Sequence, residues 1–260
     1  MNHPPARGRR GVLRTAAAVT LTTGLASTAT AAAARAESAA APPPRESLDV
    51  AVLLYDGFTA LDAVGPYETL CRLPGVRVTT VAARRGPVRT DTGQLGLVAE
   101  RSLRELPRAE VLVVPGGGER GTVATMRDAR VLEWIRGVHR HSRWTTSVCT
   151  GSLILGAAGL LRGLPATTHW ASRDYLKEVG AVYAPGRFVT AGKVITAAGV
   201  SAGIDMALHL AALLSGEQVA RAVQLAVEYD PEPPFDSGSP EKADAATRAL
   251  ALKLIADAAR

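Results

Sequence analysis

Short apolar runs alternate with segments of helical periodicity along most of this chain. The runs Leu48–Tyr55, Val111–Val114 and Trp144–Val148 are typical of strands that are buried on both faces of a parallel sheet. Segments with apolar residues at helical spacing follow such runs, for example Thr59–Leu73 and Thr150–Leu161. This alternation predicts one α/β domain, with a mostly parallel sheet and helices on both of its faces.

The rest of the chain continues the same pattern. We expect strands at Val76–Ala82 and Val194–Thr196, a hairpin within Val88–Leu97, and helices at Ala129–His141, Ser172–Val179, Ser201–Ser215 and Glu217–Glu228. The expected organisation is a leader over residues 1–36, an Ala/Pro-rich linker over 37–47, the α/β domain over 48–240 and a helical tail over 241–260.

The charge of the chain is concentrated in the leader. The whole chain of 260 residues has 30 Lys and Arg against 24 Asp and Glu, a formal net charge of +6. The first 36 residues hold five arginines and no acidic residue, so the remainder carries 25 basic against 24 acidic residues, or +1. Because that remainder has few aromatic residues and no Lys/Arg cluster, we expect no nucleic-acid partner.

The leader has the order of parts of an export signal. A basic segment that contains Arg9 and Arg10 precedes the apolar and small-residue stretch Gly11–Leu25, and small residues at Ala29–Ala31 and Ala34–Ala36 offer cleavage sites. The paired arginines and the weakly hydrophobic stretch resemble a twin-arginine signal, which exports folded proteins. We therefore predict an exported protein, periplasmic or extracellular; a disordered basic tail is the alternative.

Two later apolar stretches raise the question of a membrane span. They lie around Leu153–Leu161 and Met206–Leu214, and both are interrupted by glycine or polar residues. They fall short of the roughly 20 residues that a span needs, so we expect no span after signal removal.

The chain has only two cysteines, Cys71 and Cys149. A disulfide scaffold is therefore excluded, although the two could pair once. Cys71 lies in a helix-like segment, and we expect it to be buried, inert and unpaired.

Cys149 is the first candidate for chemistry, because it lies between a predicted strand and a predicted helix with Gly151 two positions on. This is the arrangement of a nucleophile elbow, in which a sharp turn exposes the side chain and the first amides of the helix lower the pKa of a thiol. The alternative is a core cysteine at a strand end.

The second candidate is the glycine loop Gly116, Gly117 and Gly118, which follows the strand Val111–Val114. Backbone amides of such a loop can approach an anionic or polarised atom and form half of an oxyanion hole, with the amide of Thr150 as the other half. Steric reasons alone can equally explain glycines at this kind of turn. The loop is not a phosphate loop, since no Gly-Lys-Ser/Thr follows.

The third candidate is Asp62, an acid with apolar neighbours just beyond the first strand. A desolvated carboxyl beside a thiolate would have a raised pKa and could donate a proton. A helix-capping role is the alternative.

Several further segments together carry a resemblance to a known family. They are Leu61-Asp62 followed by Gly65-Pro66, Val114-Pro115-Gly116-Gly117, Thr146 to Ser152, Ala166-Thr167-Thr168-His169-Trp170, Ala202-Gly203-Ile204-Asp205, and Glu228 to Pro231 with Phe235 and Gly238-Ser239-Pro240. From about residue 49 to 240 the chain resembles the DJ-1/PfpI superfamily, and within it the isocyanide hydratases.

The resemblance implies a flavodoxin-like (class I glutamine amidotransferase-like) sandwich, a homodimer, and hydration of a small-molecule isocyanide to an N-substituted formamide without a cofactor. It implies Cys149 as the nucleophile, Asp62 as the acid/base, and Thr150 as a neighbour that holds substrate or intermediate. Many superfamily members carry Glu where Asp62 stands, and protease-like members carry His where Thr150 stands. The chemistry agrees with the residues, because the terminal carbon of an isocyanide is electrophilic toward a thiolate.

The histidines and aromatic residues give weaker signals. His169 and Trp170 are candidates for the wall of a substrate pocket, although both are more often packed structural residues. His139 and His141, at a polar helix end, are expected to be solvated. We predict no metal site, since no group of His, Cys and Asp has convincing ligand spacing.

Two other functions compete with hydration. One is a non-catalytic binding domain like that of AraC-type regulators, which share the Thr-Thr-His-Trp text; DNA binding is not expected, because only 20 residues follow Pro240 and an export signal precedes the domain. The other is a glyoxalase-like or deglycase activity on small dicarbonyls.

Overall fold

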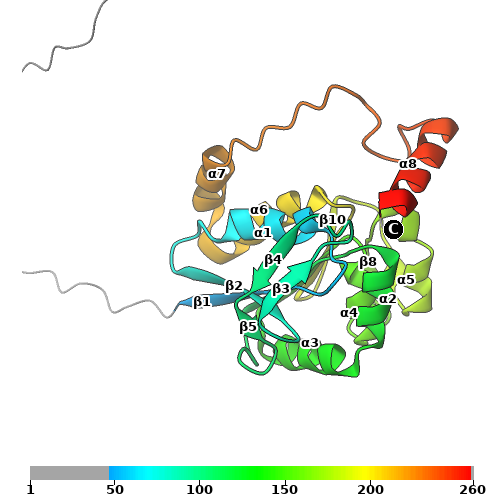
Figure 1. Cartoon of the computed structure of the whole chain (residues 1–260). Helices are drawn as coiled ribbons and strands as arrows, with labels where there is room; N and C mark the ends of the chain where they lie inside the picture. Colours follow the sequence, from blue (N-terminus) through cyan, green and yellow to red (C-terminus); the bar gives the residue numbers. More distant parts are fainter. Residues whose placement is uncertain (1–46, 259–260) are drawn as a thin grey trace, which may run out of the picture. The chain divides into compact units, whose positions relative to one another are not determined.

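The fold is described from a computed structural model, which describes residues 47–258 (Figure 1). The chain divides into two units, residues 1–43 and 44–260, and every described residue belongs to the second. The predicted export signal, residues 1–36, and the predicted linker up to residue 46 lie outside the described residues.

A seven-stranded sheet forms the centre of the domain (Figure 1). Its strands are β1 (Leu48–Leu53), β2 (Val76–Ala82), β5 (Arg101–Ser102), β6 (Val111–Val114), β7 (Trp144–Val148), β10 (Phe188–Ala191) and β11 (Val194–Ala197). They lie in the order β10-β11-β7-β6-β1-β2-β5, and neighbours are parallel except for the edge pair β10 and β11. The predicted mostly parallel sheet is confirmed.

Two short pairs of strands lie outside this sheet. The antiparallel pair β3 (Gly86–Arg89) and β4 (Gly96–Ala99) confirms the predicted hairpin. The parallel pair β8 (Pro165–Ala166) and β9 (Val182–Tyr183) was not predicted, because two-residue strands leave no periodic pattern.

Helices form the layers on either side of the sheet (Figure 1). On one side α1 (Ala60–Leu70) packs against α6 (Ala202–Ser215), and α6 against α7 (Glu217–Ala226). The other side holds α2 (Glu119–Arg127), α3 (Ala129–His141), α4 (Gly151–Ala157) and α5 (Tyr175–Glu178), with a 3₁₀ turn at Trp170–Ser172. After α7 an extended segment leads to the C-terminal helix α8 (Ala245–Ala258).

The helix α2 is the longest element that the sequence pattern did not predict. Its buried positions are Gly121, Thr122 and Thr125 rather than large apolar residues, so it lacks the apolar stripe of a surface helix. The hydroxyl of Thr125 donates to the carbonyl of Gly121 (2.8 Å), which satisfies this polar group inside the layer.

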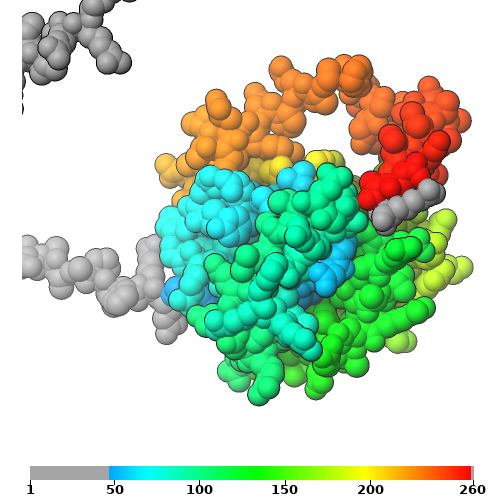
Figure 2. Space-filling model, in the orientation of Figure 1, coloured from blue at the N-terminus to red at the C-terminus, as the bar shows by residue number. Residues whose placement is uncertain are grey.

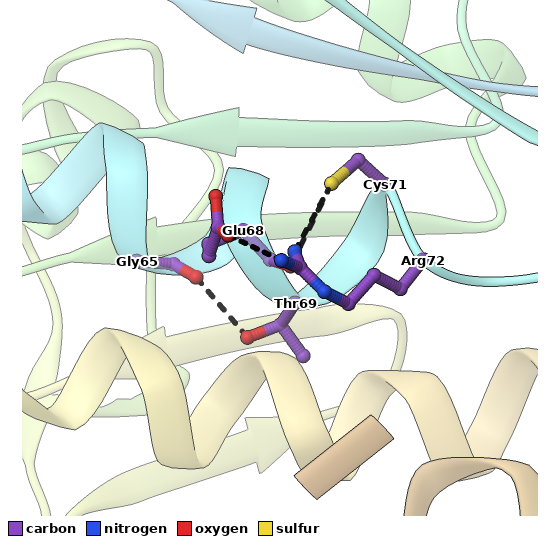
Figure 3. Close-up of polar contacts among 5 residues, drawn as sticks. All are labelled: Gly65, Glu68, Thr69, Cys71 and Arg72. Atoms are coloured by element: carbon purple, nitrogen blue, oxygen red, sulfur yellow. Dashed lines mark hydrogen bonds and ion pairs between the residues drawn. The ribbon is translucent and has the colours of Figure 1, made fainter. Parts of the chain in front are cut away.

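The helices α1 and α6 come close together at a glycine. A Cβ added to Gly65 on α1 would lie 3.1 Å from Ile204 Cγ1 on α6, so the Ile204 side chain would have to shift by a few tenths of an ångström. One turn later the buried hydroxyl of Thr69 donates back to the Gly65 carbonyl (3.1 Å), as Figure 3 shows. Close packing at this point fixes α1, and with it Asp62 in its first turn.

The strand register brings four strand ends to one edge of the sheet. Ser147 on β7 lies opposite Val114 on β6 and Thr196 on β11, and β1 is the next strand beyond β6. Ligands of open α/β sheets bind at the carboxyl ends of the strands. The residues that follow β1, β6, β7 and β11 therefore meet where a site is expected.

Candidate active site

Cys149 occupies a strained turn between β7 and α4. Its φ of 57° lies in the left-handed region, which costs a residue with a side chain roughly 1–3 kcal/mol. Its amide donates to the carbonyls of Ala197 (3.1 Å) and Ala198 (2.8 Å), which hold the turn in place. This geometry is that of the predicted elbow, and the side chain is buried at the floor of a cavity.

Asp62 lies in the first turn of α1 with no exposed surface. The N-cap of α1 is Thr59, and Asp62 Oδ2 instead accepts a hydrogen bond from the amide of Gly116 (2.9 Å), which is 54 residues away in sequence. Its other oxygen, Oδ1, is buried without an oxygen or nitrogen partner among residues 47–258. The helix-capping alternative is therefore wrong.

Burial controls the protonation of Asp62. Desolvation raises the pKa of this carboxyl from 3.8 to about 7, and the negative charge of Asp91 adds to the rise. The hydrogen bonds from the Gly116 amide and from the thiol of Cys149 act in the opposite direction. At neutral pH the carboxyl therefore exists in both protonation states, as an acid/base group requires.

The thiol of Cys149 differs from the sequence expectation. Burial, followed by the charge of Asp62, raises its pKa well above the usual value, although the amides of Thr150 and Val200 donate to the sulfur and lower it. The helix amides alone do not produce the predicted low-pKa thiol, because the desolvation of a fully buried side chain outweighs them. Asp62 and Cys149 are thus buried neighbours, and the ionisation of each influences the pKa of the other.

The amides of the glycine loop already have acceptors inside the protein. The amide of Gly116 donates to Asp62, that of Gly117 to Thr150 Oγ1 (3.0 Å), and that of Gly118 to the Gly57 carbonyl (3.0 Å). A Cβ on Gly116 would lie 2.5 Å from the Thr150 nitrogen and 2.9 Å from Asp62 Oδ2. The loop thus holds the acid and the threonine at close range, and an anion-binding role for it stays a prediction.

The hydroxyl of Thr150 is held by several neighbours. It lies 3.2 Å from the Gly117 carbonyl, to which it can donate, and 3.1 Å from the hydroxyl of Thr122 on α2. It also contributes a hydrogen bond that lowers the pKa of the Cys149 thiol. Both the amide and the side chain of Thr150 therefore favour the thiolate form of Cys149.

A cavity of about 840 Å³ opens above this group. Of the residues proposed from sequence, Gly117, Gly118, Cys149, Thr150 and His169 line it. Asp62 and Gly116 do not line the cavity, but Asp62 interacts with Cys149, which does. The structure thus brings most of the candidates together at one cavity.

His169 and Trp170 differ in position. His169 lines the cavity, and its Nδ1 accepts from the amide of Ala171 (3.3 Å), which assigns the ring proton to Nε2. Burial and the nearby Arg173 lower its pKa, so the ring is neutral at pH 7. Trp170 is not among the residues that line the cavity; it packs on His169, with ring centroids 5.6 Å apart, and its place in the pocket wall stays a prediction.

Two residues at the site were not found from sequence. The amide of Val200, just after β11, donates to the sulfur of Cys149, and Asp91 lines the cavity, where it accepts from the Thr59 hydroxyl (2.6 Å). The strand-end rule would have pointed to Val200. Nothing in the local sequence marks Asp91.

The other cysteine is remote from this chemistry. Cys71 caps the C-terminus of α1, only partly buried, and its sulfur lies 3.6 Å from Arg72, which also pairs with Glu68 (2.5 Å) (Figure 3). The expectation that Cys71 is buried is wrong, because the helix ends at Leu70 and the next side chain reaches a polar surface. Both cysteines are free, which confirms that they do not pair.

Residues 47–258 contain neither a cluster of metal ligands nor a helix that could span a membrane. Within that range no three or more His, Cys, Asp or Glu side chains gather as a metal site would require. No helix in the same range is long and apolar enough to cross a bilayer.

Comparisons with known proteins agree with the geometry. The model of the DJ-1/PfpI family matches residues 49–213. The chain is 46% identical over 200 residues to isonitrile hydratase of Pseudomonas putida, covering 77% of this chain and 86% of that protein. A crystal structure of a THiJ/PfpI family protein from Pseudomonas syringae is 40% identical with a TM-score of 0.77, covering 82% of this chain and 88% of the other.

A regulator is also similar. The HTH-type transcriptional regulator CdhR of Pseudomonas aeruginosa is 30% identical over 190 residues, which is 70% of this chain and 55% of the regulator. The shared part is therefore about half of that protein.

The cysteine elbow at the carboxyl ends of the parallel strands agrees with the family comparison. Because the family model matches well over half of this chain, the protein belongs to the DJ-1/PfpI family.

Proposed function

We propose that this protein adds water to isocyanides, R–NC, and releases N-substituted formamides, with Cys149 as the nucleophile. The observation that carries the proposal is the buried pair of Cys149 and Asp62, in which burial raises both pKa values and Cys149 lines a large cavity. The similarity to the isonitrile hydratase of Pseudomonas putida supports the substrate class.

In the first step the thiol adds to the terminal carbon of the isocyanide. The Asp62 carboxylate takes the proton of Cys149, the sulfur forms a bond to carbon, and Asp62 returns the same proton to that carbon. The product is a thioimidate, R–N=CH–S–Cys149, and no atom is lost. The amides of Thr150 and Val200, which donate to the sulfur, stabilise the thiolate that forms on the way.

In the second step water replaces the sulfur. Asp62, ionised again, takes a proton from water as it adds to the thioimidate carbon and passes that proton to the nitrogen. The tetrahedral adduct R–NH–CH(OH)–S–Cys149 then breaks its C–S bond and releases R–NH–CHO. The sulfur leaves as a thiolate that the same two amides stabilise, and Asp62 transfers the hydroxyl proton of the adduct to it, which restores the starting state.

Formamide release and the covalent intermediate test this function. The purified full chain, given cyclohexyl isocyanide, is expected to release N-cyclohexylformamide, and rapid quenching should add the mass of one isocyanide to the peptide that holds Cys149. The Cys71→Ala variant is the control and should give the same adduct. A reactive thiol with neither adduct nor formamide would overturn the proposal, and turnover of a small dicarbonyl or simple binding would then become the better explanation.

We also propose that the active form is a homodimer. The resemblance to the DJ-1/PfpI superfamily supports it, and so do Leu61 and Tyr67, two large apolar residues exposed on α1. Light scattering should give about twice the chain mass of 27.1 kDa. A mass of one chain across the working concentration range would contradict the dimer.

We further propose that the protein is exported by the twin-arginine route. The paired Arg9 and Arg10 before an apolar stretch support it. The exported protein is expected to begin near residues 32–37, and the variant Arg9→Lys/Arg10→Lys should stay in the cytoplasm. Unchanged export of that variant would contradict the route.

A further inference from the structure

The C-terminal helix α8 is unusual in its exposure. It is apolar on nearly every side, a pattern that belongs to buried helices, yet none of its residues is buried. The segment that leads to it, residues 230–238, is exposed throughout and stands away from the body in Figure 2. Core packing therefore does not explain the apolar composition of α8.

One face of α8 belongs to the cavity above Cys149. Leu252, Ile255 and Ala256 recur at the i, i+3, i+4 spacing of a single helix face, and all three line the cavity. Leu252 and Ile255 each keep 47% of their surface exposed. Leu250 and Leu254, on another face, do not line the cavity.

Other helices besides α8 also contribute apolar side chains to the cavity wall. Val123 and Met126 come from α2, Leu153 from α4, and Tyr175 and Val179 from the α5 segment. Figure 1 shows α8 beside α2 and α5. Charged residues are present as well: Asp91, Glu119, Arg120, Arg127 and Glu178.

The size of the cavity decides what it can hold. An isocyano group has two heavy atoms, whereas about 840 Å³ is the size of a pocket for a much larger ligand. Of the proposed pair only Cys149 lines the cavity, and it needs only the carbon of that group. The rest of the volume is available to the substituent R, and its walls include the apolar face of α8.

The position of α8 is fixed by polar contacts outside the cavity. Glu241, just before the helix, pairs with Arg173 (3.0 Å), which also lies over the ring of Tyr183. Arg248, in the first turns of α8, donates to the carbonyls of Pro240 (2.9 Å) and Ala243 (2.6 Å). The Glu241–Arg173 pair joins the start of α8 to the rest of the domain, the Arg248 bonds join α8 to the segment just before it, and none of them uses the apolar face.

We propose that Leu252 and Ile255 of α8 determine substrate specificity by binding a large apolar substituent of the isocyanide, such as a cycloalkyl or aryl group. This inference rests on the proposed function and assigns its substrate class. When the substituent is buried against these two side chains, apolar surface of both the substrate and the helix is removed from water. A methyl substituent would not reach them.

The test compares two double variants of the full chain, each of which replaces two large apolar residues of one face of α8 by serine. In Leu252→Ser/Ile255→Ser, kcat/KM for cyclohexyl isocyanide relative to methyl isocyanide should fall about tenfold, the range in which apolar pockets discriminate. In Leu250→Ser/Leu254→Ser, with a comparable loss of helix propensity, the ratio should stay within about twofold of the wild type. Equal ratios in the two variants would overturn the inference.

A binding measurement separates this inference from the proposed function. Calorimetry with N-cyclohexylformamide should give a dissociation constant about tenfold weaker for Leu252→Ser/Ile255→Ser than for Leu250→Ser/Leu254→Ser. If the wild type hydrates neither isocyanide but this difference is seen, the function fails and the apolar wall stands. If the wild type hydrates both isocyanides and no difference is seen, the function stands and the assignment of α8 fails.

Discussion

The two ends of β7 both carry buried polar side chains, and they differ in how those side chains are satisfied. At the carboxyl end, Cys149 is strained, Asp62 keeps one oxygen without an oxygen or nitrogen partner among the described residues, and a cavity adjoins them. At the amino end, Thr145 lies 2.9 Å from both His139 Nδ1 and Ser142 Oγ.

A lysine completes the hydrogen bonding of the cluster formed by Thr145, His139 and Ser142 at the amino end of β7. Lys193 donates to the carbonyls of His139 and Ser142, at the C-terminus of α3, where a cation is favoured. Burial and this lysine lower the pKa of His139, which is therefore neutral and hydrogen-bonded rather than solvated as predicted; His141 is exposed. The polar side chains at this end have hydrogen-bond partners and the backbone is not strained, so we interpret this end of β7 as structural.

The comparison shows that buried polarity alone does not indicate a site in this fold. Both ends contain titratable groups with shifted pKa values. Only the carboxyl end combines a shifted pKa with backbone strain, an incompletely bonded carboxyl and access to a cavity. Substitutions at the two ends should therefore affect different properties.

Removal of the nucleophile should have the largest effect. Cys149→Ala is expected to lower the rate of formamide formation by at least about 10⁴-fold, because no covalent adduct can form. Formamide release under saturating isocyanide measures this loss, and Cys71→Ala is the matched control. Residual activity within tenfold of the wild type would remove Cys149 from the mechanism.

Replacement of the acid should have the next largest effect. Asp62→Asn keeps the size of the side chain but cannot move a proton, so kcat/KM should fall about 10³-fold. In the wild type kcat/KM should rise with pH through about 7, where Asp62 loses its proton and becomes able to accept that of Cys149. The rise should be absent from the residual activity of the variant, and its persistence would assign the ionisation to another group.

Asp62→Asn should lower activity but raise stability. Asp62 ionises near 3.8 when unfolded but near 7 when folded, so rising pH between these values favours the unfolded chain. Asp62→Asn should therefore raise the free energy of unfolding by roughly 2–4 kcal/mol at about pH 8 and have little effect at about pH 4. Urea titrations at both pH values test this, and an equal effect at both would contradict the raised pKa.

At the amino end the effect should be on stability alone. Thr145→Val leaves the His139 ring nitrogen and the Ser142 hydroxyl without their shared partner, and should destabilise the fold by about 1–2 kcal/mol. Formamide formation should stay within about twofold of the wild type. A large loss of activity in a stably folded variant would show that the two ends are coupled.

The smallest effect should come from relief of strain at the elbow. Cys149→Gly should be about 1 kcal/mol more stable than Cys149→Ala, because glycine adopts a φ of 57° without steric cost. Both variants lack the nucleophile, so thermal unfolding compares them directly. Equal stability would mean that the turn is not strained.

The order of apolar runs and helical segments was enough to predict the sheet, the hairpin and most of the helices. Ala129–His141 was predicted at its observed bounds, since a clear apolar stripe and an Asp128 cap mark it. Periodicity did not predict α2, whose buried positions are threonine and glycine, or the edge strand β10, which is only partly buried. Patterns report only those elements that bury a regular apolar face.

The sequence by itself identified Cys149, Asp62 and the glycine loop, because local order along the chain places each just after a strand. Only the tertiary structure decided their protonation, since burial between distant segments raises the pKa values of both Asp62 and Cys149. It also decided which amides reach the sulfur and that α8 lines the cavity. Local sequence specifies which elements form and what chemistry each carries, whereas desolvation and contacts across the sheet arise only when those elements pack.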